Sequence, residues 1–223
     1  MKIIEVQNYQ EGVKAAFAET QKNLYLKNKL NIAIPGGKFG KSLIEYQAFL
    51  KLDFKNINFS LTDERITNNL MERNSYHLTE SLLKLKNFNN SSFFDFSFFQ
   101  DSLKLDKKIK LNKDLKLPYR FDLVYLSLGE DGHLAGHFSN SISIGSKLCI
   151  TKAASKPPPT RISFQLEWLI KSSKIIIASL GNDKKKAFDS LINKKSFHSK
   201  TILDFQDNIT FITYNQKKIN QLT

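Results

Sequence analysis

The sequence has one cysteine and no long hydrophobic run in its 223 residues. A single cysteine, Cys149, excludes an intramolecular disulfide and any metal site built from several cysteines, and it suits a reducing compartment. The longest apolar runs, FDLVYLSLG and KIIIASLG, are much shorter than the roughly 20 residues that a membrane-spanning helix needs. The first residues, MKIIEVQNYQEG, contain one lysine and no extended apolar stretch. We therefore expect no signal peptide, no membrane partner and a cytoplasmic location.

Acidic residues are also scarce, since 21 Asp and Glu face 34 Lys and Arg and the formal net charge is +13. The lysines are scattered, and the densest run, DKKKAF, holds three in a row. A nucleic-acid interface usually concentrates its basic residues on one face beside aromatic side chains. We therefore expect no nucleic-acid partner, and we interpret the charge as a field that attracts a small phosphorylated substrate.

Short apolar runs alternate with longer amphipathic segments along the chain, a pattern typical of an α/β fold with a mostly parallel sheet. The runs that predict strands are KIIEV, LNIAI, NINFSLT, RFDLVYLSL, SKLCITKA, SKIIIASLG, TILDF and ITFIT. RFDLVYLSL is apolar on both alternate faces, which places it at the centre of the sheet. Helices are predicted over residues 11–26, from the GG turn to about 51, over 75–85, around Phe164 to Ile170, and over 183–193.

Residues 86–118 are rich in Phe, Asn and Lys and have no clean period. We expect a short strand, a helix and a loop there, and the phenylalanines indicate packing rather than disorder. The chain shows no internal repeat and no linker. The sequence thus predicts a single domain over residues 1–223, with an open, mostly parallel Rossmann-like sheet flanked by helices.

Four loops that follow strand-like runs carry the residues suited to chemistry. In an open α/β sheet, ligands bind beyond the carboxyl ends of the strands, so these loops are expected to converge. The first is IAIPGGKFGKS, in which Gly36 and Gly37 would let the backbone and a helix N-terminus approach an anion. A tight turn that simply requires glycine is the alternative for this loop.

The second loop, LTDERIT, contains an acid and a guanidinium close together. Asp63 could fix a histidine, and Arg65 could clamp a phosphate because its planar fork matches phosphate oxygens. A solvated cluster of ion pairs is the alternative.

The third loop is LSLGEDGHLAGHFS, which presents a histidine between acids and glycines. His133 is a candidate general base for activating water, because a histidine side chain titrates near neutral pH. Gly129, Gly132 and Gly136 would leave backbone N–H groups free for a developing oxyanion. His137 could pair with His133 on a metal, but no carboxylate partner is defined, and we expect no metal site.

The fourth site combines SKPPPTRIS with SLGNDKKKAF. The prolines would hold their loop extended and direct Arg161, while Lys184, Lys185 or Lys186 could bind phosphate near a helix start. The alternative for the lysines is a solvated first turn of a helix.

Taken in order, these motifs resemble the 6-phosphogluconolactonase family: the Gly36-Gly37 turn, DER at 63–65, Asn74, FDLVYLSLGEDGH at 121–133, KPPPTRIS at 156–163, and a glycine followed by lysines at 181–187. The resemblance implies hydrolysis of 6-phospho-D-glucono-1,5-lactone to 6-phosphogluconate, in the oxidative pentose phosphate pathway, with no metal or organic cofactor.

By the same resemblance, His133 would activate water and Asp63 would orient the site. Arg65 and either Lys184 or Lys186 would hold the phosphate, assisted by Arg161 and the Gly36-Gly37 turn. The partner would be a phosphosugar lactone, and the chain a monomer or weak homodimer. Two alternatives stay open. One is a glucosamine-6-phosphate deaminase, a group with a similar DGH segment, and the other is a non-catalytic sugar-phosphate sensor.

Overall fold

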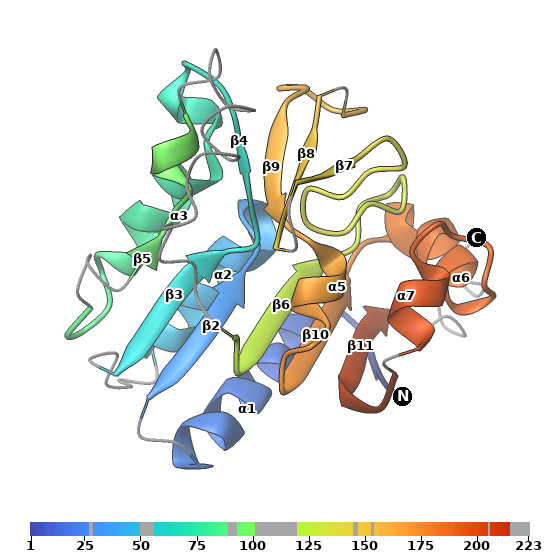
Figure 1. The fold of residues 1–223 in the computed structure, drawn as a ribbon. Helices are drawn as coiled ribbons and strands as arrows, with labels where there is room; N and C mark the ends of the chain where they lie inside the picture. Colours follow the sequence, from blue (N-terminus) through green and yellow to red (C-terminus); the bar gives the residue numbers. More distant parts are fainter. Residues whose placement is uncertain are drawn as a thin grey trace.

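The computed structural model describes residues 1–26, 29–49, 56–88, 93–100, 120–144, 147–152, 154–204 and 206–214. Within these residues the main element is a parallel sheet of seven strands in the order β1-β11-β10-β6-β2-β3-β5 (Figure 1). Its strands are β1 (Lys2–Val6), β2 (Leu30–Ile34), β3 (Ile57–Leu61), β5 (Phe93–Phe94), β6 (Leu123–Ser127), β10 (Lys174–Ser179) and β11 (Ile209–Tyr214).

The predicted central strand is confirmed. β6 is the fourth strand of the seven and pairs in parallel with β2 on one side and β10 on the other. Its residues 123–126 are fully buried. A strand covered on both faces is expected to be apolar at successive positions, which is the pattern that the sequence shows.

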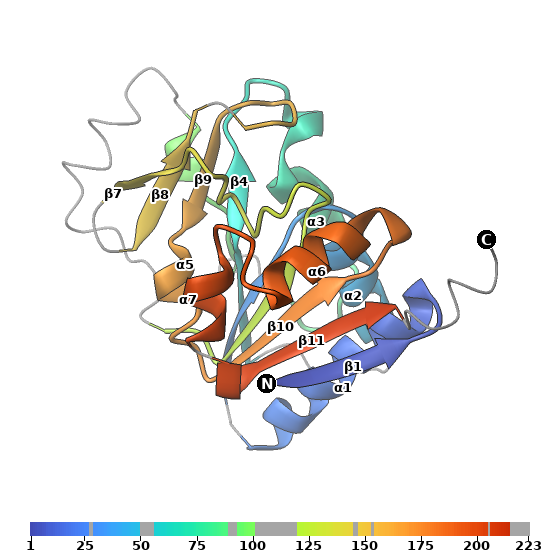
Figure 2. The same ribbon diagram turned by 90° about the vertical axis from the view of Figure 1, so that its right-hand side faces the viewer.

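Helices cover both faces of the large sheet (Figures 1 and 2). On one face lie α1 (Tyr9–Leu26) and α2 (Gly37–Phe49), and α3 (Asn74–Leu82) contacts α2. On the other face lie α5 (Leu166–Leu169) and α7 (Ser199–Leu203), with α6 (Lys185–Ile192) in contact with α7. Short 3₁₀ helices are η1 (Leu70–Glu72), η3 (Ser97–Phe99), η5 (Asn182–Lys184) and η6 (Gln206–Asn208). The predicted α/β class with a mostly parallel sheet is confirmed.

A second, smaller sheet lies beyond the carboxyl ends of the large sheet's strands (Figure 1). It is antiparallel, in the order β4-β9-β8-β7, and consists of β4 (Asp63–Arg65), β7 (Ile142–Ile144), β8 (Leu148–Thr151) and β9 (Arg161–Phe164). The sequence did not predict this sheet. DER was expected to be a loop and SKLCITKA a strand of the main sheet, because strands of three or four residues are too short to show an alternating hydrophobic pattern.

Aromatic packing attaches the small sheet to the large one. The ring of Phe164 lies 5.8 Å from that of Phe94, 5.1 Å from that of Phe96 and 5.3 Å from that of Phe121, measured between centroids. Phe96 and Phe99 are almost fully buried. The packing role expected for the phenylalanines is therefore confirmed for Phe94, Phe96 and Phe99, whereas residues 101–119 lie outside the described residues.

Two local predictions were wrong. TILDF was predicted as a strand, but Ser199–Leu203 form helix α7. Ser199 Oγ accepts from the Ser196 amide at 3.1 Å and donates to the Leu191 carbonyl at 2.9 Å, so tertiary contacts override the strand preference of this run. The helix expected around Phe164 to Ile170 is a single turn, since Phe164 belongs to β9.

We found no helix in the described part of the chain that is long and apolar enough to cross a membrane.

Candidate active site

The four loops meet at one cleft of about 600 Å³. Its walls come from the segments after β2, β3, β6 and β10 and from the small sheet, as the carboxyl-end rule for parallel sheets predicts. The lining includes Gly36, Gly37, Asp63, Arg65, Asn74, Gly129, Glu130, His133, Lys156, Arg161 and Lys184. Of the residues that the resemblance assigns to the site, only Lys186 does not line this space.

His133 is held by a carboxylate from its own loop. Its Nδ1 contacts Oδ1 of Asp131, and its backbone amide donates to the same oxygen at 3.3 Å. The imidazole also stacks on Phe138, with centroids 4.6 Å apart and planes 17° apart. Gly129 is required here, because a Cβ atom at this position would lie 2.2 Å from His133 Nδ1. The loop thus presents an oriented imidazole to the cleft.

Asp131, which contacts His133, was not among the site residues expected from the sequence. Burial alone would raise its pKa, but hydrogen bonds from Ser155 and His133 and the nearby imidazole outweigh burial and lower the pKa to about 2. It therefore carries a negative charge at neutral pH. The signal was present in GEDGH, because an acid two residues before a histidine can reach its ring when the intervening residue is glycine.

Asp63 occupies a different part of the cleft wall. It is buried, and its carboxylate accepts from Thr62 Oγ1 at 2.9 Å and from Asn74 Nδ2 at 3.3 Å. Asn74 in turn packs against Gly36, where a Cβ atom would lie 2.1 Å from Asn74 Cγ. These contacts join the GG turn, Asn74 and Asp63. Among the described residues, the carboxylate that contacts His133 belongs to Asp131 rather than to Asp63.

Arg65 and Arg161 lie opposite each other on neighbouring strands of the small sheet. They are directly opposed residues of the β4–β9 ladder. Burial and the neighbouring Arg65 lower the pKa of Arg161, while nearby carboxylates including Asp63 raise it. Arg161 Nη1 is buried and has no hydrogen-bond partner among the described residues. Two opposed cations with an unused N–H donor are costly unless an anion binds them.

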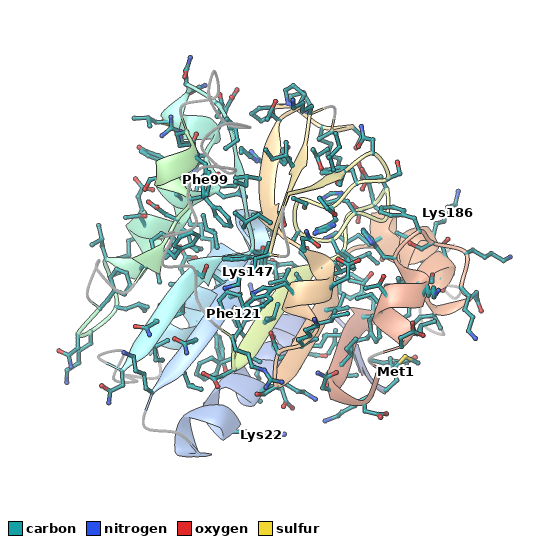
Figure 3. All side chains as sticks on the ribbon, in the orientation of Figure 1. Met1, Lys22, Phe99, Phe121, Lys147 and Lys186 are labelled. Atoms are coloured by element: carbon teal, nitrogen blue, oxygen red, sulfur yellow. The ribbon has the colours of Figure 1, made fainter. Side chains whose placement is uncertain are left out.

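Lys184 and Lys186 lie in different positions relative to the cleft. Lys184 ends η5, lines the cleft, and donates from Nζ to Ser127 Oγ at 3.0 Å. Its pKa is lowered chiefly by burial. Lys186 is exposed on α6 and points to the outside of the molecule (Figure 3). Of the two lysines left open by the sequence, the cleft contains Lys184.

The glycine amides expected to face an oxyanion are already used. Gly129 N donates to the His133 carbonyl at 2.9 Å, and Gly132 N donates to the Gly129 carbonyl at 3.1 Å. Gly136 N donates to Ser163 Oγ at 3.2 Å. These glycines fold the loop, and the expectation that their N–H groups are free was wrong.

His137 lies in the interior below the loop. Its Nε2 is 2.9 Å from the Phe164 carbonyl oxygen and 3.3 Å from Cys149 Sγ, and its own carbonyl oxygen is 3.2 Å from His198 Nε2. Burial lowers the pKa of His137. In the described ranges, no group of three or more His, Cys, Asp or Glu side chains is arranged to hold a metal ion.

Solved structures with this fold have two different activities. The 6-phosphogluconolactonase from Trypanosoma cruzi superimposes with a TM-score of 0.77 at 20% identity, covering 100% of this chain and 97% of that one. A monomeric glucosamine-6-phosphate deaminase superimposes with a TM-score of 0.76 at 15% identity, covering 98% and 99% of the two chains. At such identities the likeness shows the fold alone.

Sequence similarity is higher but local. Probable 6-phosphogluconolactonase 2 of Oryza sativa subsp. indica is 39% identical over 71 residues, which are 30% of this chain and 25% of the rice protein. The match thus spans about a quarter of that relative. A sequence model of the family described as glucosamine-6-phosphate isomerases/6-phosphogluconolactonase matches residues 5–209. The chain therefore belongs to the glucosamine-6-phosphate isomerase/6-phosphogluconolactonase family.

Proposed function

We propose that this protein hydrolyses 6-phospho-D-glucono-1,5-lactone to 6-phosphogluconate. The observation that carries the proposal is the cleft itself, in which His133, held by Asp131 of its own loop, shares one space with Arg65, Arg161 and Lys184. A base held by a carboxylate suits the activation of water, and a cluster of cations suits a phosphate group. The named rice relative supports the lactonase over the deaminase within the family.

In the proposed first step, His133 takes a proton from a water molecule as the water oxygen bonds to the lactone carbonyl carbon. The carbonyl π electrons move to its oxygen and form a tetrahedral oxyanion. Asp131 keeps the imidazole in one orientation through Nδ1 and stabilises the positive charge that develops on the ring.

In the second step, the oxyanion collapses and the bond from the carbonyl carbon to the ring oxygen breaks. The ring oxygen leaves with the proton that His133 had taken, which restores the neutral base. The product acid then loses a proton to solvent and becomes a carboxylate. In sum, one 6-phosphogluconolactone and one water give one 6-phosphogluconate and one proton.

We assign binding of the substrate's phosphate group to three cationic side chains of the cleft. Arg161 offers the buried Nη1 that has no partner among the described residues, and Arg65 lies opposite it on the ladder. Lys184 adds a further positive charge to the cleft wall. Asp63, held by Thr62 and Asn74, orients this wall and partly balances its charge.

The decisive experiment measures hydrolysis of freshly generated 6-phosphogluconolactone against its spontaneous opening. We expect a large acceleration by the protein and its loss in His133→Ala, with binding of 6-phosphogluconate retained. His77→Ala is the matched control, since His77 belongs to α3 and does not line the cleft.

Two results would contradict the proposal. Ammonia release from glucosamine 6-phosphate without lactone hydrolysis would identify a deaminase. Tight binding of 6-phosphogluconate without any acceleration would identify a sugar-phosphate sensor.

A further inference from the structure

The proline-rich loop (residues 155–160) contacts both acids of the histidine loop (residues 128–138). Ser155 Oγ donates to Asp131 Oδ2 at 2.5 Å, and Lys156 Nζ lies 2.6 Å from Glu130 Oε1. Adjacent residues of one loop thus contact adjacent residues of the other. The histidine loop is therefore fixed at two points by a segment distant in the sequence.

The proline-rich loop has its own anchors. Arg161 Nη2 donates to the Lys156 carbonyl at 3.0 Å and to the Pro157 carbonyl at 3.3 Å. At the base of the loop, the Ala154 amide donates to the Pro159 carbonyl at 2.9 Å. Ser155 therefore lies on a segment whose position is set by the backbone and by a buried arginine.

A second cavity, of about 260 Å³, meets the first at His133. It is lined by Asp131, His133, Phe138, Ser139, Asn140, Ser155 and Phe197. His133 and Phe138 line both spaces, whereas Asp131 and Ser155 line the second one. The Asp131 carboxylate is thus reached from the side away from the main cleft.

We propose that Ser155 is a positioning residue for His133, acting through Asp131. One carboxylate oxygen of Asp131 holds the imidazole Nδ1 and the backbone amide of His133, and the other accepts the Ser155 hydroxyl. Donors on both oxygens fix the rotation of the carboxylate, and so fix the direction of the ring. The effect on turnover rests on the proposed lactonase function, but the effect on the ring does not.

The charged groups around His133 come from several elements. Asp131 and Glu130 belong to its own loop, Lys156 to the proline-rich loop, Lys184 to η5, and His198 to the turn before α7. Loss of the Ser155 hydroxyl frees one oxygen of Asp131 and lets the carboxylate rotate. Because Asp131 contacts the ring directly, the contact with His133 Nδ1 then loses its fixed direction.

The test compares Ser155→Ala with Ser139→Ala, a matched control in the same cavity where no hydrogen bond to Asp131 is removed. In Ser155→Ala we expect kcat to fall about 10-fold with KM unchanged, since one charge-assisted hydrogen bond is lost. We also expect the NMR signals of the His133 ring to change in the free protein, because the ring loses its fixed contact with Asp131. Ser155→Thr, which restores a hydroxyl, should recover both properties.

The NMR measurement separates this proposal from the reaction, because it needs no substrate. His133 ring signals in Ser155→Ala that match those of the original protein would overturn the positioning role, whatever the activity. Equal effects of Ser139→Ala and Ser155→Ala would also overturn it. A rise in KM together with the fall in kcat would show that the loop had moved at Arg161, which contradicts the proposal as well.

Discussion

At the scale of single residues, the site depends on the absence of a side chain at Gly129. Any Cβ atom there would overlap both the His133 ring and the Asp131 carboxylate, at 2.2 Å and 2.7 Å. Gly36 has the same relation to Asn74, which holds Asp63. Two glycines therefore allow two carboxylates to take separate positions, Asp63 in the wall of the cleft and Asp131 in the second cavity beside His133.

This separation predicts different effects for the two acids. Asp131→Asn should lower kcat about 100-fold or more, because an amide cannot balance the charge that forms on His133. Asp63→Asn should act mainly on KM through the arginine wall. Steady-state kinetics on the lactone distinguishes the two, and an equal loss of kcat in both variants would contradict the assignment of Asp131 to the histidine.

At the scale of elements, the small sheet places two like-charged strand residues opposite each other. Like charges directly opposed on an antiparallel ladder are destabilising without a counterion. Arg65 and Arg161 occupy such a pair, and a hydrogen-bond donor of Arg161 is left without a partner in the described part of the chain. In the proposed function, a bound phosphate would stabilise this arrangement.

Arg161→Met should therefore raise KM about 10-fold to 100-fold, as expected for charge-assisted contacts present in ground and transition states, and kcat should also fall up to about 10-fold because Arg161 anchors the loop that carries Ser155. Arg120→Met is the control, since Arg120 is exposed and its Nε donates to the Lys171 carbonyl away from the cleft. Calorimetric binding of 6-phosphogluconate provides the check. Unchanged affinity in Arg161→Met would rule out the arginine pair as the phosphate site.

The junction of η5 and α6 offers a second comparison. Lys184→Met should weaken phosphosugar binding about 10-fold, because it removes a partly buried cation from the cleft. Lys186→Met should leave binding unchanged, since Lys186 is exposed outside the cleft. The two dissociation constants, measured at the same ionic strength, test the division, and the reverse order would refute it.

At the scale of the whole molecule, buried histidines couple stability to pH. Burial lowers the pKa of His198 from its ordinary value of 6.5 to about 4. Between these values the unfolded chain binds a proton that the folded chain does not. The free energy of unfolding therefore falls as the pH decreases from about 6.5 to about 4.

His198→Gln should remove this part of the pH dependence, which is roughly 3 kcal/mol for such a difference in pKa. Urea unfolding at a series of pH values from 7 to about 4 measures it. His77→Gln, a histidine substitution on α3, should retain the dependence. A curve for His198→Gln that stays parallel to that of the original protein would show that the coupling arises elsewhere.

Much of the molecule could be predicted from residue patterns alone. Apolar runs report burial directly, so β6 was placed at the centre of the sheet and most strands were located. Loops at the carboxyl ends of parallel strands must share one edge, so Gly36, Asp63, His133 and Arg161 were expected to converge, and they line one cleft.

The sequence by itself determined which residues follow each strand at the edge of the sheet. It could do so because the positions of the strands follow from the hydrophobic pattern, which reports burial. Tertiary structure alone decided which of them touch. Side-chain directions and contacts between distant segments decided the small sheet, the Asp131–His133 contact, helix α7 and the choice of Lys184 over Lys186. Lys184 ends η5 and Lys186 lies on α6, so two positions separate a lysine that lines the cleft from one that is exposed.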